Sequence, residues 1–251
     1  MKPKERRSRI FDTIQQEGRI SVDKLVAEFN SSAETIRRDL NKLSKSGKIQ
    51  KIHGGAILPG SSEEGSYQQR MGENAKAKRL AAQKASTLIS PGETLFIDTG
   101  SSTLFFAEEV AEIAGLTVIT NSAEVARVVS SSKNGASVFL LGGEYNADNR
   151  ETKGPTTITQ LENFHAHHAV LATGGIDAVA GVMSFDEGEA AVARAMLSRA
   201  ENVIVLADSS KCGRIAPFVI GELARFDCLV CESAPGQILQ NALNQHSVKI
   251  V

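Results

Sequence analysis

The stretch TLFIDTGSST, residues 94–103, decides how this sequence folds. Its first four residues are a short apolar run typical of a buried β-strand, and the strand stops at an acid, Asp98. The glycine and hydroxyl residues that follow lie where the next helix is predicted to begin, and the amides at a helix N-terminus suit a phosphate group. The stretch therefore predicts a strand, a phosphate-binding loop and a helix, and it leaves open whether the bound group reacts or is only sensed.

The same alternation continues to the end of the chain. The other apolar runs are LTVIT, SVFLLGG, HAVLATGG, NVIVLAD, CLVCE and VKIV, and the helical segments between most of them are 103–113, 123–129, 156–163, 186–199 and 236–244. Short Val/Ile/Leu runs separated by helices predict an α/β fold with a mostly parallel sheet covered on both faces. Ligands of such sheets bind beyond the carboxyl ends of the strands.

Five successive strand ends carry Gly, hydroxyl or ionisable residues, which we expect to meet in one pocket. The TGSST amides and hydroxyls would hold a phosphate, Lys211 would add a positive charge, and Asp98, Asp177 and Glu189 would accept hydrogen bonds from sugar hydroxyls. Each of these residues taken singly is equally well explained as a turn residue or a helix cap. The predicted effector-binding residues are Asp98, Gly100, Ser101, Ser102, Thr103, Asn121, Gly142, Gly143, Gly175, Asp177, Glu189 and Lys211.

The composition of the 251 residues is that of a globular protein, with 41% hydrophobic and 23% charged residues. No apolar run approaches the ~18 residues of a membrane helix, and the N-terminus lacks the apolar core of a signal peptide, so we expect a cytoplasmic protein without a membrane partner. Cys212, Cys228 and Cys231 are an odd number of cysteines in a long chain, which predicts no disulfide framework. Cys228 and Cys231 fall on a predicted strand and are expected to be buried thiols rather than metal or redox ligands.

Charge is distributed unevenly along the chain. Residues 1–57 carry 13 Lys and Arg against 7 Asp and Glu, whereas the remaining residues carry 15 against 22, so a segment of charge +6 precedes a body of charge −7. A small basic segment on an acidic body favours contact between that segment and a polyanion, with chance as the alternative explanation.

The basic segment has the pattern of three short helices. Ile10, Phe11 and Ile14 share one face of the first helix, which Gly18 is expected to end. Ser21 is expected to cap the second helix, SVDKLVAEF. In the third, Ser31 and Glu34 have capping-box spacing, the apolar stripe is Ile36, Leu40 and Leu43, and Gly47 is expected to stop the helix.

Two short helices joined by a tight turn, the second basic at its start, predict a helix-turn-helix that places the second helix in the major groove of DNA. The segment KIQKIHGGAIL predicts a hairpin behind it, that is, a wing. Asp39 is expected to pair with a neighbouring Arg or cap an amide, and the alternative for all these charges is simple solvation of a helical bundle. The predicted DNA contacts are Ser32, Glu34, Thr35, Arg37, Arg38, Lys42, Lys51 and His53.

The segment LPGSSEEGS breaks the apolar pattern and is typical of a linker. The expected organisation is a winged helix-turn-helix domain over 1–57, a linker over 58–72, and a ligand-binding and oligomerisation domain over 73–251.

The runs TIRRDLNKL, SGKI and HGGA, followed by FIDTGSST, TVITNS, LLGGE, GGID, FDEGEAAVARAM and LADSSKCGR, resemble the DeoR-type bacterial transcription regulators over nearly the whole chain. The resemblance implies a C-terminal sensor domain similar in fold to ribose-5-phosphate isomerase, glucosamine-6-phosphate deaminase and CoA transferases. It also implies a repressor of a carbohydrate catabolic operon, released from operator DNA by a phosphorylated sugar. The chain departs from many relatives at His167-His168, where they have Asp-Lys, and at 170–172, where they have Phe-hydrophobic-Gly.

The alternative function is a sugar-phosphate isomerase or deaminase fused to a DNA-binding module, although a fold alone does not establish activity. Matching two half-sites on DNA requires at least a homodimer, and the resemblance favours a homotetramer. No cofactor and no metal are expected. His165, His167 and His168 remain open between a metal site, a ligand contact and surface packing.

Overall fold

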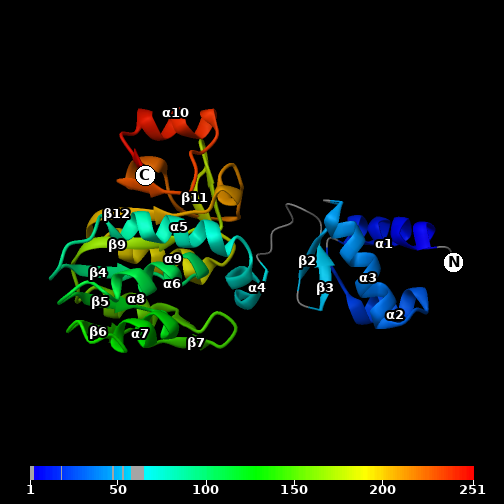
Figure 1. Ribbon diagram of the computed structural model, residues 1–251, viewed down its shortest axis with the longest axis horizontal. Coiled ribbons are helices and arrows are strands. Elements are labelled where there is room, and N and C mark those ends of the chain that lie inside the picture. The colour runs from blue at the N-terminus through cyan, green and yellow to red at the C-terminus, as the bar shows by residue number, and fades with distance from the viewer. Residues whose placement is uncertain (1–2, 18, 47, 53, 58–64) are drawn as a thin grey trace. The chain divides into compact units, whose positions relative to one another are not determined.

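The computed structural model describes residues 3–17, 19–46, 48–52, 54–57 and 65–251 (Figure 1). The chain separates into two compact units, Met1–Gln69 and Arg70–Val251, and each has its own hydrophobic core. Of the predicted linker, residues 58–64 lie outside the described residues, and the helix α4 (Tyr67–Gly72) occupies its last part. Gly18 and Gly47, which were expected to end two helices, also lie outside the described residues.

The first unit is a helix-turn-helix with a three-stranded sheet. The predicted hairpin is present as β2 and β3, and β1 adds a third antiparallel strand on the far side of β3 that the apolar pattern did not reveal. A Cβ on Gly55 would lie 2.2 Å from the carbonyl oxygen of Ile20, so only glycine lets β1 and β3 pair this closely. The elements are α1 (Pro3–Glu17), β1 (Arg19–Ser21), α2 (Val22–Phe29), α3 (Ala33–Lys45), β2 (Gln50–Ile52) and β3 (Gly55–Ile57).

The core of this unit consists of the predicted apolar stripes. Ile10 and Ile14 from α1, Leu25 from α2, and Ile36 and Leu40 from α3 are all fully buried. Burial of side chains this large contributes about 1.5–3 kcal/mol each. These contacts fix α3 against α1 and α2 and leave its other face exposed.

The start of α3 differs from the prediction by one residue. The N-cap is Ser32, whose Oγ accepts a hydrogen bond from the amide of Thr35 at 3.3 Å. Ser31 instead donates its hydroxyl to the carbonyl of Phe29, because Asn30 ends α2 in a left-handed conformation and turns the chain. The predicted capping box of Ser31 and Glu34 is therefore wrong, since Ser32 already binds the first free amides.

The second unit is built on a seven-stranded sheet in which every pair is parallel, in the order β15-β14-β12-β9-β4-β5-β6. All seven predicted strands are present. They are β4 (Thr94–Ile97), β5 (Thr117–Thr120), β6 (Ser137–Leu140), β9 (Ala166–Ala172), β12 (Ala200–Leu206), β14 (Cys228–Val230) and β15 (Lys249–Ile250).

Helices cover both faces of this sheet, as predicted. Ala169 and Leu171 of β9 share a core with α9, whereas Val170 between them is equally buried and points to the opposite face. The helices α5, α6 and α7 form one layer, and α8 and α9 form another. Their bounds are α5 (Ala75–Ser86), α6 (Ser101–Val110), α7 (Ala123–Ser130), α8 (Pro155–Leu161) and α9 (Glu187–Leu197).

Several short elements lie outside this pattern and were not predicted as strands. An antiparallel sheet of order β10-β11-β13 follows the carboxyl end of β9, and the hairpin of β7 and β8 follows β6. Figure 1 shows α10 at the β14–β15 end of the main sheet. The bounds are β7 (Glu144–Asn146), β8 (Glu151–Lys153), β10 (Gly175–Asp177), β11 (Gly181–Ser184), β13 (Phe218–Gly221), α10 (Gln237–Gln245), and the 3₁₀ turns η1 (Ser209–Lys211) and η2 (Leu223–Arg225).

The order of strands reverses between β4 and β9. From β4 the chain adds β5 and β6 on one side, and from β9 it adds β12, β14 and β15 on the other. The carboxyl ends of β4 and β9 therefore flank the position at which open α/β sheets bind ligands. Asp98 leaves β4 at this point, and its amide donates to the carbonyl of Val170 at 3.0 Å.

Candidate functional site

The exposed face of α3 carries most of the predicted DNA contacts. Ser32 is exposed at the start of the helix, and its hydroxyl lies 2.9 Å from that of the half-buried Thr35. Arg37 and Lys42 project from the same helix and are exposed. This face presents hydroxyls at its N-terminus and cations along its length, which suits contact with bases and phosphates.

The remaining predicted DNA contacts form weak exposed pairs. Arg38 Nη2 donates to Glu34 Oε1 at 2.8 Å, and these side chains are 68% and 81% exposed. An ion pair this exposed contributes little stability, so Arg38 can exchange the carboxylate for a phosphate at small cost. Lys51 Nζ on the wing donates to Asn41 Oδ1 at 2.6 Å. His53 lies outside the described residues.

Asp39 anchors α3 to α1 instead of facing DNA. Its carboxylate is buried and accepts hydrogen bonds from Arg6 Nε at 2.6 Å and Arg7 Nη1 at 3.3 Å. The predicted pairing of Asp39 with an arginine is confirmed, and its partners come from the first helix. A buried carboxylate held by two cations fixes the orientation of α3, because removing it would leave arginine charges without their partner.

In the second unit, Asp98 and Asn121 leave the sheet side by side. Ile97 pairs with Thr120 in the register of β4 and β5, so the next residue of each strand lies at the same edge. Both side chains are buried. Asn121 Nδ2 donates to the carbonyl of Thr152 at 3.1 Å, whereas its Oδ1 has no donor among the described residues.

The N-terminus of α6 begins directly after Asp98. Gly100 is the N-cap residue, Ser101 and Thr103 are buried and Ser102 is half-buried. A Cβ on Gly100 would lie 2.6 Å from the Cβ of Ala172, so the helix starts in contact with the end of β9. The first-turn amides of this ten-residue helix carry the positive end of the helix dipole at the reversal point of the sheet.

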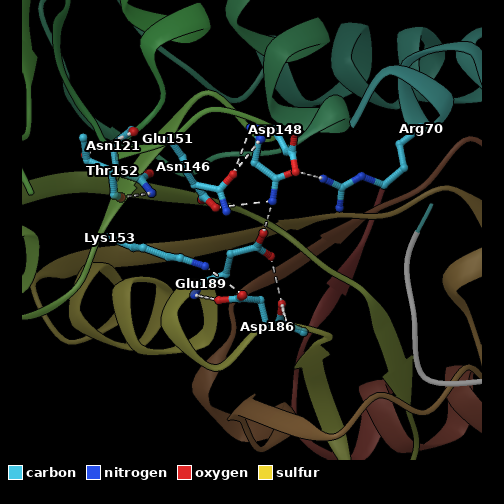
Figure 2. A network of polar contacts seen from close by, with 11 residues as sticks. Arg70, Asn121, Asn146, Asp148, Glu151, Thr152, Lys153, Asp186 and Glu189 are labelled. Carbon is cyan, nitrogen blue, oxygen red and sulfur yellow. Dashed lines mark hydrogen bonds and ion pairs between the residues drawn. The ribbon is translucent and has the colours of Figure 1, made fainter. Parts of the chain in front are cut away.

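A partly buried polar network closes the site on the other side (Figure 2). Asn149 Nδ2 donates to Glu189 Oε1 at 2.7 Å and to Glu151 Oε1 at 3.3 Å. Ser184 Oγ donates to Glu189 Oε2 at 3.0 Å, and Arg70 Nη2 donates to Asn149 Oδ1 at 3.0 Å. In Figure 2, Arg70 approaches from one side of the network, while Asn121 and Thr152 lie on the other. The hairpin of β7 and β8 thus joins α4 to α9.

The carboxyl groups of this network hold their protons unusually strongly. The pKa of Glu151 is raised to about 8, mainly by burial and next by the nearby charge of Glu189. Burial, then Glu189 and Glu151, raise the pKa of Asp98 well above its ordinary range. A protonated carboxyl both donates and accepts, so these groups can meet either end of a hydroxyl dipole.

Lys153 supplies a cation beside these acids. Its Nζ donates to Asp186 Oδ2 at 2.7 Å. Burial alone would lower the pKa of Lys153, but the hydrogen bond and charge of Asp186 raise it, with help from Glu151 and Glu189. Lys153 therefore stays charged at the N-terminal end of α9, where Asp186 is the N-cap.

Gly142 and Gly143 serve the packing of α8 against the end of β6. A Cβ on Gly143, which has a φ of +151°, would lie 2.1 Å from Thr157 Oγ1. That hydroxyl donates to the carbonyl of Gly142 at 2.9 Å, and the amide of Gly142 donates to Gln160 at 3.0 Å. Both glycines lie at the predicted edge, and their small size has a structural reason.

Lys211 lies in η1, close to the start of α5. Asn74 Nδ2 donates to Asp208 Oδ1 at 3.0 Å and to Ser210 Oγ at 3.2 Å. Burial lowers the pKa of the nearby Lys78, with Asp208 opposing and Lys211 adding to the decrease. Lys211 thus belongs to a cluster formed by η1 and the start of α5.

Two predicted residues have other roles. Asp177 Oδ1 accepts hydrogen bonds from the amides of Val179 at 2.9 Å and Ala180 at 3.0 Å, which lowers the pKa of Asp177. Its carboxylate therefore closes the β10–β11 turn, and a contact with sugar hydroxyls stays a prediction. Gly175 lies in β10, where a Cβ would be 2.3 Å from the carbonyl oxygen of Arg214.

The three histidines lie at the amino end of β9, opposite to Asp98. His167 Nδ1 accepts from the amide of Thr94 at 3.0 Å, and His168 Nε2 is 3.4 Å from Glu93. His165 is exposed beside Glu201. Surface packing is therefore the alternative that the structure supports. Among the described residues, no group of three or more His, Cys, Asp or Glu side chains is placed to hold a metal ion.

Arg70, Asn149 and Glu151 belong to the site although the sequence did not indicate them. Glu151 and Asn149 lie in the polar segment NADNRETK, which has no apolar periodicity. Arg70 fell in the predicted linker. The packing of the β7–β8 hairpin on β5, through the amide of Thr152 and the carbonyl of Asn121 at 2.8 Å, brings the hairpin to this edge.

Comparison with known proteins decides the family. Residues 6–62 match the DeoR-like helix-turn-helix domain, and residues 73–233 match the DeoR C-terminal sensor domain. The chain belongs to the DeoR family. It is a DNA-binding transcriptional regulator with a C-terminal sensor domain.

Curated DeoR-family relatives align over nearly their whole length. The glycerol-3-phosphate regulon repressor of Escherichia coli is 30% identical over 100% of this chain and 99% of its own length. The transcriptional repressor GlcR of Bacillus subtilis is 31% identical over 100% and 96%, and the L-fucose operon activator of Haemophilus influenzae is 31% identical over 96% and 97%. All three relatives are thus named as transcriptional regulators, two of them as repressors and one as an activator.

A solved ribose 5-phosphate isomerase from Methanocaldococcus jannaschii overlaps 55% of this chain and 55% of its own, with 16% sequence identity and a TM-score of 0.41. None of the helices in the described ranges is both long and apolar enough to cross a membrane.

Proposed function

We propose that this DeoR-family regulator is a repressor whose sensor domain binds a phosphorylated sugar or polyol, and that binding releases it from operator DNA. The observation that carries the proposal is the pairing of two complementary features at one edge. The N-terminus of α6 offers amides to a phosphate, and buried polar atoms beside it, Asn121 Oδ1 and Glu151 Oε2, have no donor among the described residues. A sugar hydroxyl supplies such a donor.

The division of labour follows from this arrangement. Gly100, Ser101, Ser102 and Thr103 would hold the phosphate through the first turn of α6. Asp98, Asn121, Glu151 and Glu189 would face the hydroxyl-bearing carbons. Lys211, together with Lys153, would supply positive charge. The relative named for repression of a glycerol-3-phosphate regulon supports a small phosphorylated polyol as one candidate class.

Coupling to DNA would pass through Arg70. This residue begins the second unit, and its guanidinium is bonded to Asn149, which also contacts Glu189 and Glu151. A ligand that competes for Asn149 or Glu189 would therefore change the contact of Arg70 and with it the position of α4. A ligand shifts affinity for DNA only by binding two states of the protein differently. The two states proposed here differ in whether Arg70 is bonded to Asn149.

The regulator would act as a homodimer or homotetramer, since two copies of α3 are needed to fill two half-sites. The contacts proposed on DNA are Ser32, Glu34, Thr35, Arg37, Arg38, Lys42, Lys51 and His53.

The test combines DNA selection with ligand screening. Operator sequences are selected from a random DNA pool by the full chain, and thermal unfolding is then followed with phosphorylated pentoses, hexoses and polyols and with the same sugars lacking phosphate. A ligand present at 100 times its Kd adds about 2.7 kcal/mol to stability, so a clear rise in melting temperature is expected for the phosphorylated form alone. The same ligand should release the selected DNA.

Two substitutions and a matched control sharpen this test. Lys211→Ala should abolish the response to ligand and keep DNA binding, and Arg38→Ala should do the reverse. Lys133→Ala, which changes an exposed lysine on the loop after α7, should alter neither. Equal shifts with unphosphorylated sugars would contradict the phosphate site, and turnover of a sugar phosphate would support the isomerase or deaminase alternative instead.

A further inference from the structure

Two of the three cysteines, distant in sequence, meet at the carboxyl end of β12 and β14. Leu206 pairs with Val230, so the segments that leave these neighbouring strands run side by side. The amide of Ser209 donates to both carboxylate oxygens of Glu232, at 3.2 and 3.0 Å. The first segment then ends at Cys212 and the second begins at Cys231, and their thiols are in hydrogen-bonding contact.

The two thiols have unequal access. Cys231 is buried, and its single thiol proton can be donated either to Glu232 Oε2, 3.2 Å away, or to Cys212. Cys212 is half-buried and lines a cavity of about 460 Å³ together with Gly236 and Gln237. A small molecule can therefore reach Cys212, whereas Cys231 is shielded from solvent. Such a pair, one accessible thiol beside a second buried one, is the arrangement found at redox-sensitive cysteines.

The electronic situation of the thiols agrees with this order. The hydrogen bond from Cys231 lowers the pKa of Cys212, against the effects of burial and nearby carboxylates. The same hydrogen bond and burial raise the pKa of Cys231. Cys212 is thus the thiol more readily present as the nucleophilic thiolate.

We propose that Cys212 and Cys231 form a reversible intramolecular disulfide when the chain meets an oxidised low-molecular-weight thiol such as glutathione disulfide. The Cys212 thiolate attacks one sulfur of that disulfide, which forms a mixed disulfide and releases one glutathione thiolate. Cys231 loses its proton to the glutathione thiolate released in the first step or to water, and it attacks Cys212 Sγ, which releases the second glutathione. Two protein thiols are oxidised and one external disulfide is reduced to two thiols, so atoms and electrons balance.

The bond would fix the segment 208–213. Cys212 follows Lys211 directly, and the same segment holds Asn74 at the start of α5 through Asp208 and Ser210. The disulfide would tie this segment to the end of β14 and restrict its movement. If Lys211 contacts the effector, as proposed above, oxidation would also change the response to effector, and this last step rests on the proposed function.

The direct test is chemical and independent of any effector. The native full chain is incubated with glutathione disulfide, free thiols are blocked, and the chain is digested without reductant for mass spectrometry. We expect a peptide pair linking Cys212 to Cys231, two hydrogens lighter than the separate thiols, that disappears on reduction. Hydrogen exchange of residues 208–213 should slow in the linked protein.

The variants separate the roles of the three cysteines. Cys231→Ser should leave only the mixed disulfide of Cys212 with glutathione, and Cys212→Ser should remove the link. Cys228→Ser is the matched control, because Cys228 is buried at the start of β14, and the link should form as in the wild type. A link that involves Cys228, or no link under conditions where the denatured chain is oxidised, would overturn the proposal. If the link forms and the response to effector does not change, the disulfide is confirmed and the effect on effector binding through Lys211 is rejected.

Discussion

Glu151 is a fully buried acid whose protonation depends on its surroundings, and it therefore links stability to pH. Its pKa is about 8 in the folded chain, against an ordinary value of 4.5. Between these values the folded state binds a proton that the unfolded state has lost. The free energy of unfolding therefore decreases as the pH rises through this window, by at most about 1.4 kcal/mol per pH unit from this group.

Glu151→Gln should remove this part of the pH dependence. We expect the variant to lose less stability than the wild type between about pH 5 and 8, as measured by urea unfolding across that range. Glu144→Gln is the matched control, because Glu144 is exposed in the same hairpin, and it should keep the wild-type slope. An unchanged slope in Glu151→Gln would show that Glu151 is ionised in the native protein at neutral pH.

At the scale of single elements, the glycine N-caps of α6 and α10 differ in their surroundings. Gly100 is the N-cap of α6 and its added Cβ would lie 2.6 Å from the Cβ of Ala172, whereas Gly236 is the N-cap of α10 with a φ of −59° and open space around it. We expect Gly100→Ala to destabilise the chain by about 1–3 kcal/mol through this overlap, and to weaken phosphate binding. Gly236→Ala should destabilise the chain by less, about 0.5–1 kcal/mol, because alanine is only a poorer N-cap residue there and meets no neighbouring atom.

Chemical unfolding of both variants, together with titration of the effector that the screen identifies, provides the measurement. Equal stability of the two alanine variants would mean that α6 can move away from β9 at no cost. Such mobility would contradict a preformed phosphate site at this helix.

Periodicity sufficed for the elements that bury a continuous face. The stripe of Ile36, Leu40 and Leu43 and the seven apolar runs of the main sheet were predictable, because a helix or strand of this kind repeats its signal several times. The strands β1, β7, β8 and β10 carry polar residues or glycine, so they lack the continuous apolar run that marked even the two-residue β15. The apolar strands β11 and β13 were missed as well. Local spacing also failed at Ser31, since the helix is capped by Ser32, which has Thr35 and not Glu or Gln three residues after it.

The candidate site was predictable where residues follow a strand directly, as Asp98 and Asn121 do. Glu151 and Arg70 come from a hairpin and a short helix whose positions depend on tertiary packing. Asp177 also follows a predicted strand directly, but its carboxylate accepts the amide of Val179, two residues later, and so closes its own turn. Strand ends therefore indicate the edge of a site, and the residues that close it need the folded structure.

At the scale of the whole molecule, DNA and effector should oppose one another symmetrically. If effector lowers affinity for the selected operator by some factor, operator must lower affinity for effector by the same factor, typically about 5- to 150-fold. Fluorescence anisotropy of labelled DNA and calorimetric titration of effector, with and without DNA, measure the two factors. Arg38→Ala should bind effector equally well with and without DNA. Unequal factors in the wild type would mean that the two ligands are not linked through one equilibrium.

The reversal of strand order between β4 and β9 has a consequence for how the chain folds during synthesis. Phe96 pairs with Ala169, so the centre of the main sheet cannot close until a long intervening segment has been made. In the first unit the strand pairs are closer in sequence, from Gln50 with Ile57 in the hairpin to Arg19 with Ile57 between β1 and β3. Local contacts form fast and distant parallel pairs form slowly, so the DNA-binding unit should leave the ribosome and fold before its sensor exists. During synthesis the DNA-binding unit would thus fold first and the sensor domain last.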